Sequence, residues 1–93
     1  MSSASWTAEA REDLGRIDDY YRALDSGVAH EIGSKAIAAG RFLAEHPFAG
    51  APLDDGENRK WRVPRTPYLL LYRVLNDRVQ ILRVRHTAED WRA

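Results

Sequence analysis

The 93-residue chain contains no cysteine, one methionine and only two lysines, Lys35 and Lys60. Without cysteine, disulfide bonds, a catalytic thiol and cysteine-ligated metal sites are excluded. The absence of cysteine is also compatible with a reducing cytoplasm, so we expect a cytoplasmic protein. The first residues, MSSASW, lack the basic and apolar segments of a signal peptide, and the longest hydrophobic run, residues 68–72, is far shorter than a membrane span.

Motifs of several enzyme classes are missing as well. The sequence has no glycine-rich phosphate-binding loop and no serine–histidine–aspartate motif. The histidines fall on separate predicted elements without metal-ligand spacing, and the acidic residues of the 54–57 segment are interpreted as a solvated loop. We therefore expect neither a metal ion nor a cofactor. The length predicts one domain over residues 1–93.

Charge is distributed unevenly along a chain whose net charge is zero. Residues 1–58 hold five Lys/Arg and eleven Asp/Glu, a net charge of −6, whereas residues 59–93 hold nine Lys/Arg and three Asp/Glu, a net charge of +6. Such an asymmetry indicates a basic functional surface on the second half. The alternative is that a short sheet uses arginine on its solvated side.

Apolar spacing predicts a helical hairpin in the first half. After a short possible strand at residues 3–6, Thr7 is a candidate N-cap for a helix whose apolar residues recur every three or four positions, at Ala10, Leu14, Ile17, Tyr21 and Leu24. Residues 25–27 interrupt this pattern and can cap a second helix, which Pro47 ends at about residue 45 or 46. The small residues Ala36, Ala39 and Gly40 would let the two helices approach closely.

The second half follows a strand-like period. Residues 47–58 are expected to be a loop, residues 59–63 a short strand, and residues 68–75 and 78–85 a hairpin around Asn76-Asp77. The predicted order is β-α-α-β-β-β, an α+β fold in which a helical hairpin packs on a small antiparallel sheet in two layers. Pairing Leu75 with Arg78 places Arg83 and Arg85 on the face of Tyr68, Leu70 and Tyr72, and places Val84 and His86 on the face of Leu69 and Leu71. Both faces are partly apolar, so one is expected to pack on the helices and the other to meet a partner.

Four motifs in order resemble the RelE/ParE family of toxins from bacterial type II toxin–antitoxin systems. They are W-T-x-x-A-x-x-D-L at residues 6–14, L-x-x-x-P-x-x-G at 43–50, P-Y-L-L-L-Y-R-V at 67–74 and I-L-R-V-R-H-T-A-E-D-W at 81–91. Each motif is weak alone, but together they cover nearly the whole chain. The resemblance implies a toxin, associated with functions such as plasmid stabilisation, that a co-expressed ParD-like or similar antitoxin wraps and neutralises in a hetero-oligomer.

Two activities are implied by this resemblance. RelE-like members enter the ribosomal A site and cut messenger RNA, whereas ParE-like members bind and poison DNA gyrase without cleaving a substrate. RNA cleavage needs a base, an acid and cations on the phosphate. His86 is the candidate acid–base residue, although it could simply end a strand and hydrogen-bond across a turn.

Departures from the RelE-like pattern favour the ParE-like interpretation, a protein-binding inhibitor and not an enzyme. Tyr68 is followed by Leu69 where RelE-like ribonucleases usually have arginine, and the acid pair Glu89-Asp90 would repel RNA. A ribonuclease and a copy that binds antitoxin but has lost toxicity remain alternatives. The candidate target-binding residues are Arg62, Arg65, Arg73, Arg83, Arg85 and Trp91. The candidate antitoxin-binding residues are Leu14, Ile17, Tyr20, Tyr21, Arg59, Trp61 and Val63.

Overall fold

The computed structural model describes residues 3–89 and contains two helices and five strands within that range. Their order along the chain is β1 (Ala4–Trp6), α1 (Ala8–Arg22), α2 (Ser26–Glu45), β2 (Ala51–Pro52), β3 (Asn58–Arg62), β4 (Tyr68–Val74) and β5 (Val79–His86). The predicted helical hairpin and C-terminal strands are confirmed. The predicted loop at 47–58 also contains a strand, because β2 pairs with Arg59 and Lys60 of β3.

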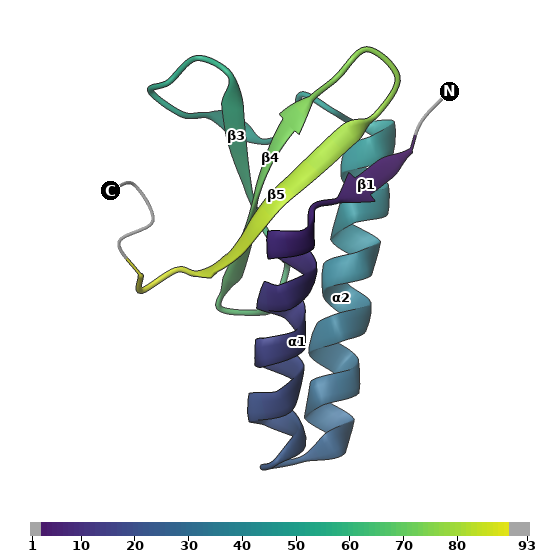
Figure 1. Ribbon diagram of the computed structural model, residues 1–93, viewed down its shortest axis with the longest axis vertical. Helices are drawn as coiled ribbons and strands as arrows, with labels where there is room; N and C mark the ends of the chain where they lie inside the picture. The colour runs from purple at the N-terminus through teal and green to yellow at the C-terminus, as the bar shows by residue number, and fades with distance from the viewer. Residues whose placement is uncertain (1–2, 90–93) are drawn as a thin grey trace.

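The five strands form one sheet in the order β1-β5-β4-β3-β2. Every neighbouring pair is antiparallel except β1 and β5, which run parallel, so the sheet is mixed and not purely antiparallel as the sequence suggested. Both helices lie on one face of this sheet, giving the expected two-layer α+β architecture (Figure 1). The lower part of the hairpin extends beyond the sheet, so only one half of it is covered by strands (Figure 1).

Side chains cap the N-terminal ends of both helices, as the sequence predicted. The Thr7 hydroxyl accepts a hydrogen bond from the Ala10 N–H at 3.1 Å, and the Asp25 carboxylate accepts from the Gly27 N–H at 2.8 Å. These bonds satisfy N–H groups that have no partner in the first turn of a helix. The Thr7 hydroxyl also donates to the Leu82 carbonyl at 2.9 Å, so the cap of α1 is tied to β5.

A β-bulge in the β4–β5 hairpin corrects the predicted assignment of residues to faces. Val74 pairs with Val79 and Tyr72 with Ile81 as predicted, but Leu71 pairs with Arg83, which leaves Leu82 as the extra residue. A shift of one residue exchanges the two faces of a strand. Beyond the bulge, Val84 and His86 therefore share the helix-covered face with Leu70 and Tyr68, whereas Arg83 and Arg85 share the opposite face with Leu71 and Leu69.

The core lies between the helices and the covered face of the sheet. Leu43 of α2 and Leu70, Tyr72 and Ile81 of the sheet have no solvent-exposed side-chain surface. The Tyr72 hydroxyl donates to the Pro47 carbonyl at 2.7 Å and accepts from the Gly50 N–H at 2.9 Å, which holds the segment after α2 against β4. Within residues 3–89, no helix is both long enough and apolar enough to span a bilayer.

Candidate functional site

Two of the predicted target-binding arginines lie on the sheet face that the helices leave open. Arg62 is paired across β4 and β5 with Leu69 and Arg85, and Arg73 is paired with Gln80. Cross-strand partners share a face, so these arginines lie around Leu71, which is partly exposed, while Leu69 is only 6% exposed. The Arg62 Nε donates to the Thr66 carbonyl at 3.1 Å and the Arg73 Nε donates to the Gln80 Oε1 at 2.8 Å.

The two predicted target-binding arginines of β5, Arg83 and Arg85, extend around the edge of the sheet toward α1. The Arg83 Nε and a terminal nitrogen donate to the two carboxylate oxygens of Asp13 at 2.8 and 3.0 Å. Arg85 instead borders a cavity that also contains Arg16 of α1. The structure thus divides the predicted basic patch between an open face and a strand edge.

Asp13 joins α1 to β5 and was not identified from the sequence. Its side chain is 3% exposed, and its carboxylate also accepts from the Val84 N–H at 2.9 Å and from Arg16. Burial acts to raise the pKa of Asp13, but the hydrogen bonds from Arg83 and Val84 and the charges of Arg83 and Arg16 outweigh it and hold the pKa below its usual range. One signal was available: Asp13 lies three residues after Ala10 and four before Ile17, inside the apolar stripe of the helix.

His86, the candidate acid–base residue, is engaged in the turn that follows β5. Its Nδ1 accepts a hydrogen bond from the Ala88 N–H at 3.0 Å, and its ring meets the Tyr68 ring edge-on at a centroid distance of 5.3 Å. The Glu89 carboxylate accepts from the backbone N–H of His86 at 2.8 Å. Since a backbone N–H can only donate, Nδ1 carries a lone pair and the neutral ring holds its proton on Nε2.

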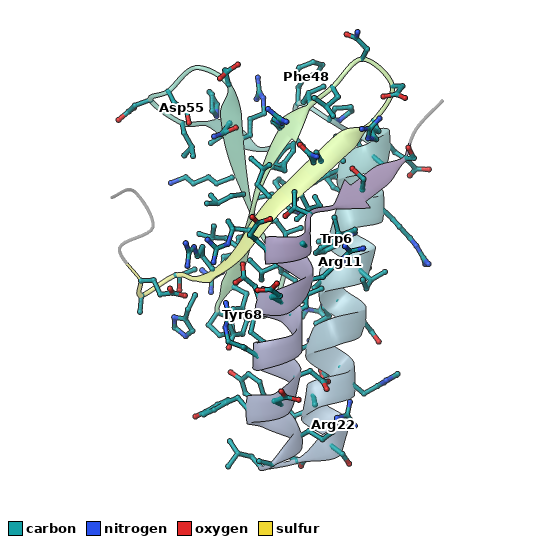
Figure 2. The ribbon with its side chains drawn as sticks, viewed as in Figure 1. Trp6, Arg11, Arg22, Phe48, Asp55 and Tyr68 are labelled. Atoms are coloured by element: carbon teal, nitrogen blue, oxygen red, sulfur yellow. The ribbon has the colours of Figure 1, made fainter. Side chains whose placement is uncertain are left out.

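Tyr68 lies beside α1 at the end of the sheet that faces the hairpin (Figure 2). Its hydroxyl donates to the Tyr21 hydroxyl at 3.3 Å. Burial, followed by the hydrogen bond to Tyr21, raises the pKa of Tyr68 well above its usual range, so this phenol stays protonated. Arg65 lies in the turn between β3 and β4 with a φ of 62°, and its side chain is exposed. Trp91, the remaining predicted target contact, lies outside the described residues.

The predicted antitoxin contacts on α1 have different exposures. Leu14 and Ile17 are partly buried and line a groove between the two helices, and Tyr20 is 63% exposed. Tyr21 packs edge-on against both Tyr20 and Tyr68. These side chains thus lie on the hairpin surface that the sheet leaves free or beside the end of the sheet.

The predicted contacts on β3 are more varied. Arg59 donates to the Gly50 carbonyl at 2.7 Å and lies over the exposed Phe48 ring at 5.0 Å, and Trp61 stacks on Phe42 of α2 at 5.2 Å. Val63 is 1% exposed and belongs to the core, so its side chain is not available at the surface. Figure 2 shows that Phe48 and Arg22 lie at opposite ends of the molecule.

The groove between α1 and α2 encloses about 620 Å³. Two glycines, Gly15 and Gly33, line it, and a Cβ atom placed on either would have no neighbour within 4 Å. Glycine inside a helix costs about 0.5–1 kcal/mol relative to alanine. No packing contact within residues 3–89 explains that cost, so both positions leave an open floor in the groove. No cluster of three potential metal ligands occurs within residues 3–89.

Comparison with known proteins agrees with these features. The family model described as the ParE toxin of the type II toxin–antitoxin system parDE matches residues 4–91. Toxin RelE2 of Caulobacter vibrioides is 32% identical over 88 residues, which cover 95% of this chain and 98% of that protein.

Two solved structures are also similar. One, from the chromosomal ParDE toxin–antitoxin system of P. aeruginosa, has a TM-score of 0.81 and 28% identity and covers 92% of this chain and 96% of its own. The other, from the toxin–antitoxin complex RelBE2 of Mycobacterium tuberculosis, has a TM-score of 0.63 and 27% identity and covers 91% of this chain and 96% of its own. The chain belongs to the ParE toxin family of type II toxin–antitoxin systems, within the RelE/ParE superfamily.

Proposed function

We propose that this toxin acts by binding a protein target, DNA gyrase, and not by cutting RNA. The two activities of the superfamily make different demands on the chain. A ribonuclease needs a side chain that exchanges a proton with the reacting oxygens, whereas an inhibitor needs only a surface complementary to its target. The state of His86 therefore carries the proposal.

The hydrogen bond on His86 Nδ1 opposes both catalytic roles. A histidine that acts as a base through Nε2 must carry its proton on Nδ1, and a histidine that acts as an acid carries protons on both nitrogens. In either role Nδ1 would hold a hydrogen that faces the Ala88 N–H, which lies 3.0 Å away. Either role would therefore break the hydrogen bond between the Ala88 N–H and the His86 Nδ1.

The open face of the sheet suits a protein contact better than a phosphate backbone. It combines the partly exposed Leu71 with the exposed Arg62 and Arg73 in a mixed apolar and basic surface. Apolar area surrounded by arginine is typical of protein interfaces, in which arginine is enriched. Arg83, which would be needed to hold a phosphate beside these residues, is already bound by Asp13.

Two assays run in parallel test this proposal. Purified toxin is incubated with gyrase and supercoiled DNA, and separately with programmed ribosomes and messenger RNA. We expect accumulation of cleaved-DNA complexes with intact message, and we expect His86→Ala to keep that effect. Arg62→Ala combined with Arg73→Ala should weaken it through lost contacts. Codon-positioned cuts that vanish in His86→Ala would overturn the proposal in favour of a ribonuclease. Inactivity in both assays would indicate a copy that has lost toxicity.

We also propose that an antitoxin neutralises the chain by laying an amphipathic segment in the hairpin groove. Both similar solved structures come from toxin–antitoxin systems. The groove offers apolar side chains at helical spacing, Leu14, Ile17 and Ile32, above the open floor at Gly15 and Gly33. A helix that buries its apolar face can approach such a floor closely, and this approach would explain why the two positions lack side chains.

Substitution of the groove floor separates binding from folding. Gly33→Leu should leave the toxin folded, since space is open there, but should weaken antitoxin binding about 10-fold or more by blocking close approach. Isothermal titration calorimetry with the co-encoded antitoxin measures the affinity. Lys35→Leu, on the same helix but not among the groove residues, serves as the control. Unchanged affinity in Gly33→Leu would place the antitoxin elsewhere.

A further inference from the structure

A second cavity, separate from the hairpin groove, opens between α1 and the end of β5. It encloses about 240 Å³ and is bordered by polar side chains of α1, β4, β5 and the turn after β5: Arg16, Tyr20, Tyr68, Arg85, His86 and Glu89. Among the described residues, no strand covers the edge of β5 here, because β1 pairs only with its first residues, 79–81. The Asp13 and Glu89 carboxylates instead accept hydrogen bonds from the Val84 and His86 N–H groups on this edge. The cavity is thus enclosed by one helix, the end of β5 and the turn after β5.

Arg85 lines this cavity with hydrogen-bonding capacity that is not used within the described residues. Its Nε is buried and has no hydrogen-bond partner. Its terminal nitrogen lies 3.5 Å from the Glu89 carboxylate, an ion pair longer than an ordinary hydrogen bond. A buried donor without a partner is costly, and a guanidinium can bind a carboxylate through two parallel hydrogen bonds. The Arg85 side chain is 28% exposed, so its terminal nitrogens are able to bind an anionic ligand with a gain in hydrogen bonding.

Other donors point to the same class of ligand. His86 has its proton on Nε2, because Nδ1 accepts from the Ala88 N–H. One terminal nitrogen of Arg16 is bound to Asp13, and the Arg16 side chain is largely exposed. Tyr20 contributes an exposed hydroxyl. The acceptor Asp13 is saturated, since it already receives hydrogen bonds from two arginines and the Val84 N–H.

The local charge balance favours a singly charged ligand over a doubly charged phosphate group. The charged side chains that line the cavity are balanced, with Arg16 and Arg85 against Asp13 and Glu89. Arg83, which binds Asp13 from outside the cavity, also interacts with the charge of Glu9. A doubly charged phosphate group would bring excess negative charge beside Glu89 at the rim, where like charges repel. The Ile17 side chain in the cavity wall suits an aliphatic stem.

We propose that this cavity binds the side-chain carboxylate of a glutamate presented by a protein partner. The carboxylate contacts the Arg85 guanidinium and the Nε2–H of His86, with Arg16 beside it, and the aliphatic stem lies against Ile17. The inference depends on the proposed function only in taking the carboxylate from a protein and not from a nucleic acid. The cavity lies at the end of the sheet next to the hairpin, so one partner segment can reach both it and the groove.

A titration of the full chain with small probes tests the cavity without gyrase or antitoxin. The probe is glutamate blocked at both backbone ends, with blocked glutamine as its uncharged match, and the readout is the Arg85 Nε–H signal in a ¹⁵N-correlated NMR spectrum. We expect the glutamate probe to shift this signal and the glutamine probe to leave it in place. Arg85→Gln should weaken binding about tenfold or more, while Arg11→Gln, an exposed arginine elsewhere on α1, should not change it.

Two further measurements test the site with a conservative variant of Arg85 and with phosphate-containing probes. If Arg85→Gln does not fold, Arg85→Lys retains the charge but loses the planar fork, and it should still weaken binding severalfold. Inorganic phosphate or a short single-stranded RNA that binds through Arg85 at least tenfold more tightly than blocked glutamate would overturn the proposal in favour of a phosphate site. The absence of any probe-dependent shift at Arg85 would overturn it outright. Neither result depends on the outcome of the gyrase assay.

Discussion

The two halves of the helical hairpin obey different constraints, although they belong to the same two helices. The near half, residues 8–14 and 36–45, lies on the sheet and buries Ala10, Asp13, Gly40 and Leu43. The far half, residues 15–22 and 26–35, buries only Ala29 and leaves Tyr20 63% exposed. Helical periodicity continues across both halves, but the near half buries its apolar residues in the core, whereas Ile17, Tyr21 and Ile32 of the far half are only partly buried.

The largest expected effect is the loss of the Asp13 carboxylate from the near half. Asp13→Ala should lower the free energy of unfolding by about 2–4 kcal/mol, because it leaves the Val84 N–H and two arginines without their acceptor. Partial exposure of Arg83 and Arg16 limits the cost, since water can solvate them. Urea unfolding followed by circular dichroism measures the change.

Asp18→Ala is the matched control for this variant in the far half. It removes an exposed carboxylate that pairs with Arg22 one turn away, and exposed pairs contribute little to stability. If both variants lost the same stability, the contrast between the halves would be refuted.

Acid should weaken the same link in the near half. The folded pKa of Asp13 lies below its unfolded value of about 3.9. A lowered carboxyl pKa contributes stability that is present above the unfolded pKa and is lost as the pH falls through the folded pKa. The difference in unfolding free energy between wild type and Asp13→Asn should therefore shrink as the pH is lowered from about 5 toward 2. Urea unfolding at a series of pH values gives this difference, and a gap that widened in acid would contradict the assignment.

The smallest expected effects come from a pair of glycines on α2. Gly40 is in the near half, where an added Cβ would lie 2.9 Å from the Trp6 ring, whereas Gly33 is in the far half, where it would meet nothing. Gly40→Ala should therefore cost about 1–2 kcal/mol, because Trp6 must shift. Gly33→Ala should instead stabilise the isolated chain by about 0.5–1 kcal/mol through helix propensity. Thermal unfolding of both variants tests the comparison, and stabilisation by both would show that Trp6 does not constrain the near half.

Most of the fold could be predicted because its signals are local. Thr7 and Asp25 cap helices through side-chain bonds within a few residues, and Pro47 follows the end of α2. The short strand β2 was missed because two residues carry no periodic signal, and its pairing with Arg59 and Lys60 is a contact across a loop. The β4–β5 bulge was missed for a related reason: the turn at 76–77 determines the register only near the turn, and the extra residue, Leu82, is accommodated farther along the strands.

The candidate site was less predictable because it depends on contacts between distant elements. The sequence indicated a basic second half and named the arginines, but it could not show that Arg83 turns to Asp13, 70 positions earlier, while Arg62 and Arg73 remain on the open face. It identified His86 as the candidate acid–base residue, but it could not show which ring nitrogen accepts a hydrogen bond from the turn that follows β5. It placed Val63 among the partner contacts, although the side chain belongs to the core.

The sequence by itself determined the two helices, the three strands that follow the 47–58 segment, the order of these elements and the family, because capping residues, hydrophobic periods and motifs are properties of short segments. Only the tertiary structure decided which charges are available to a partner. The buried carboxylate of Asp13 binds Arg16 and Arg83, the bulge at Leu82 turns two arginines away from the core, and the open groove at Gly15 and Gly33 exists only once two helices pack together. These outcomes depend on desolvation and on distances between residues far apart in the chain, and neither quantity is encoded in a local pattern.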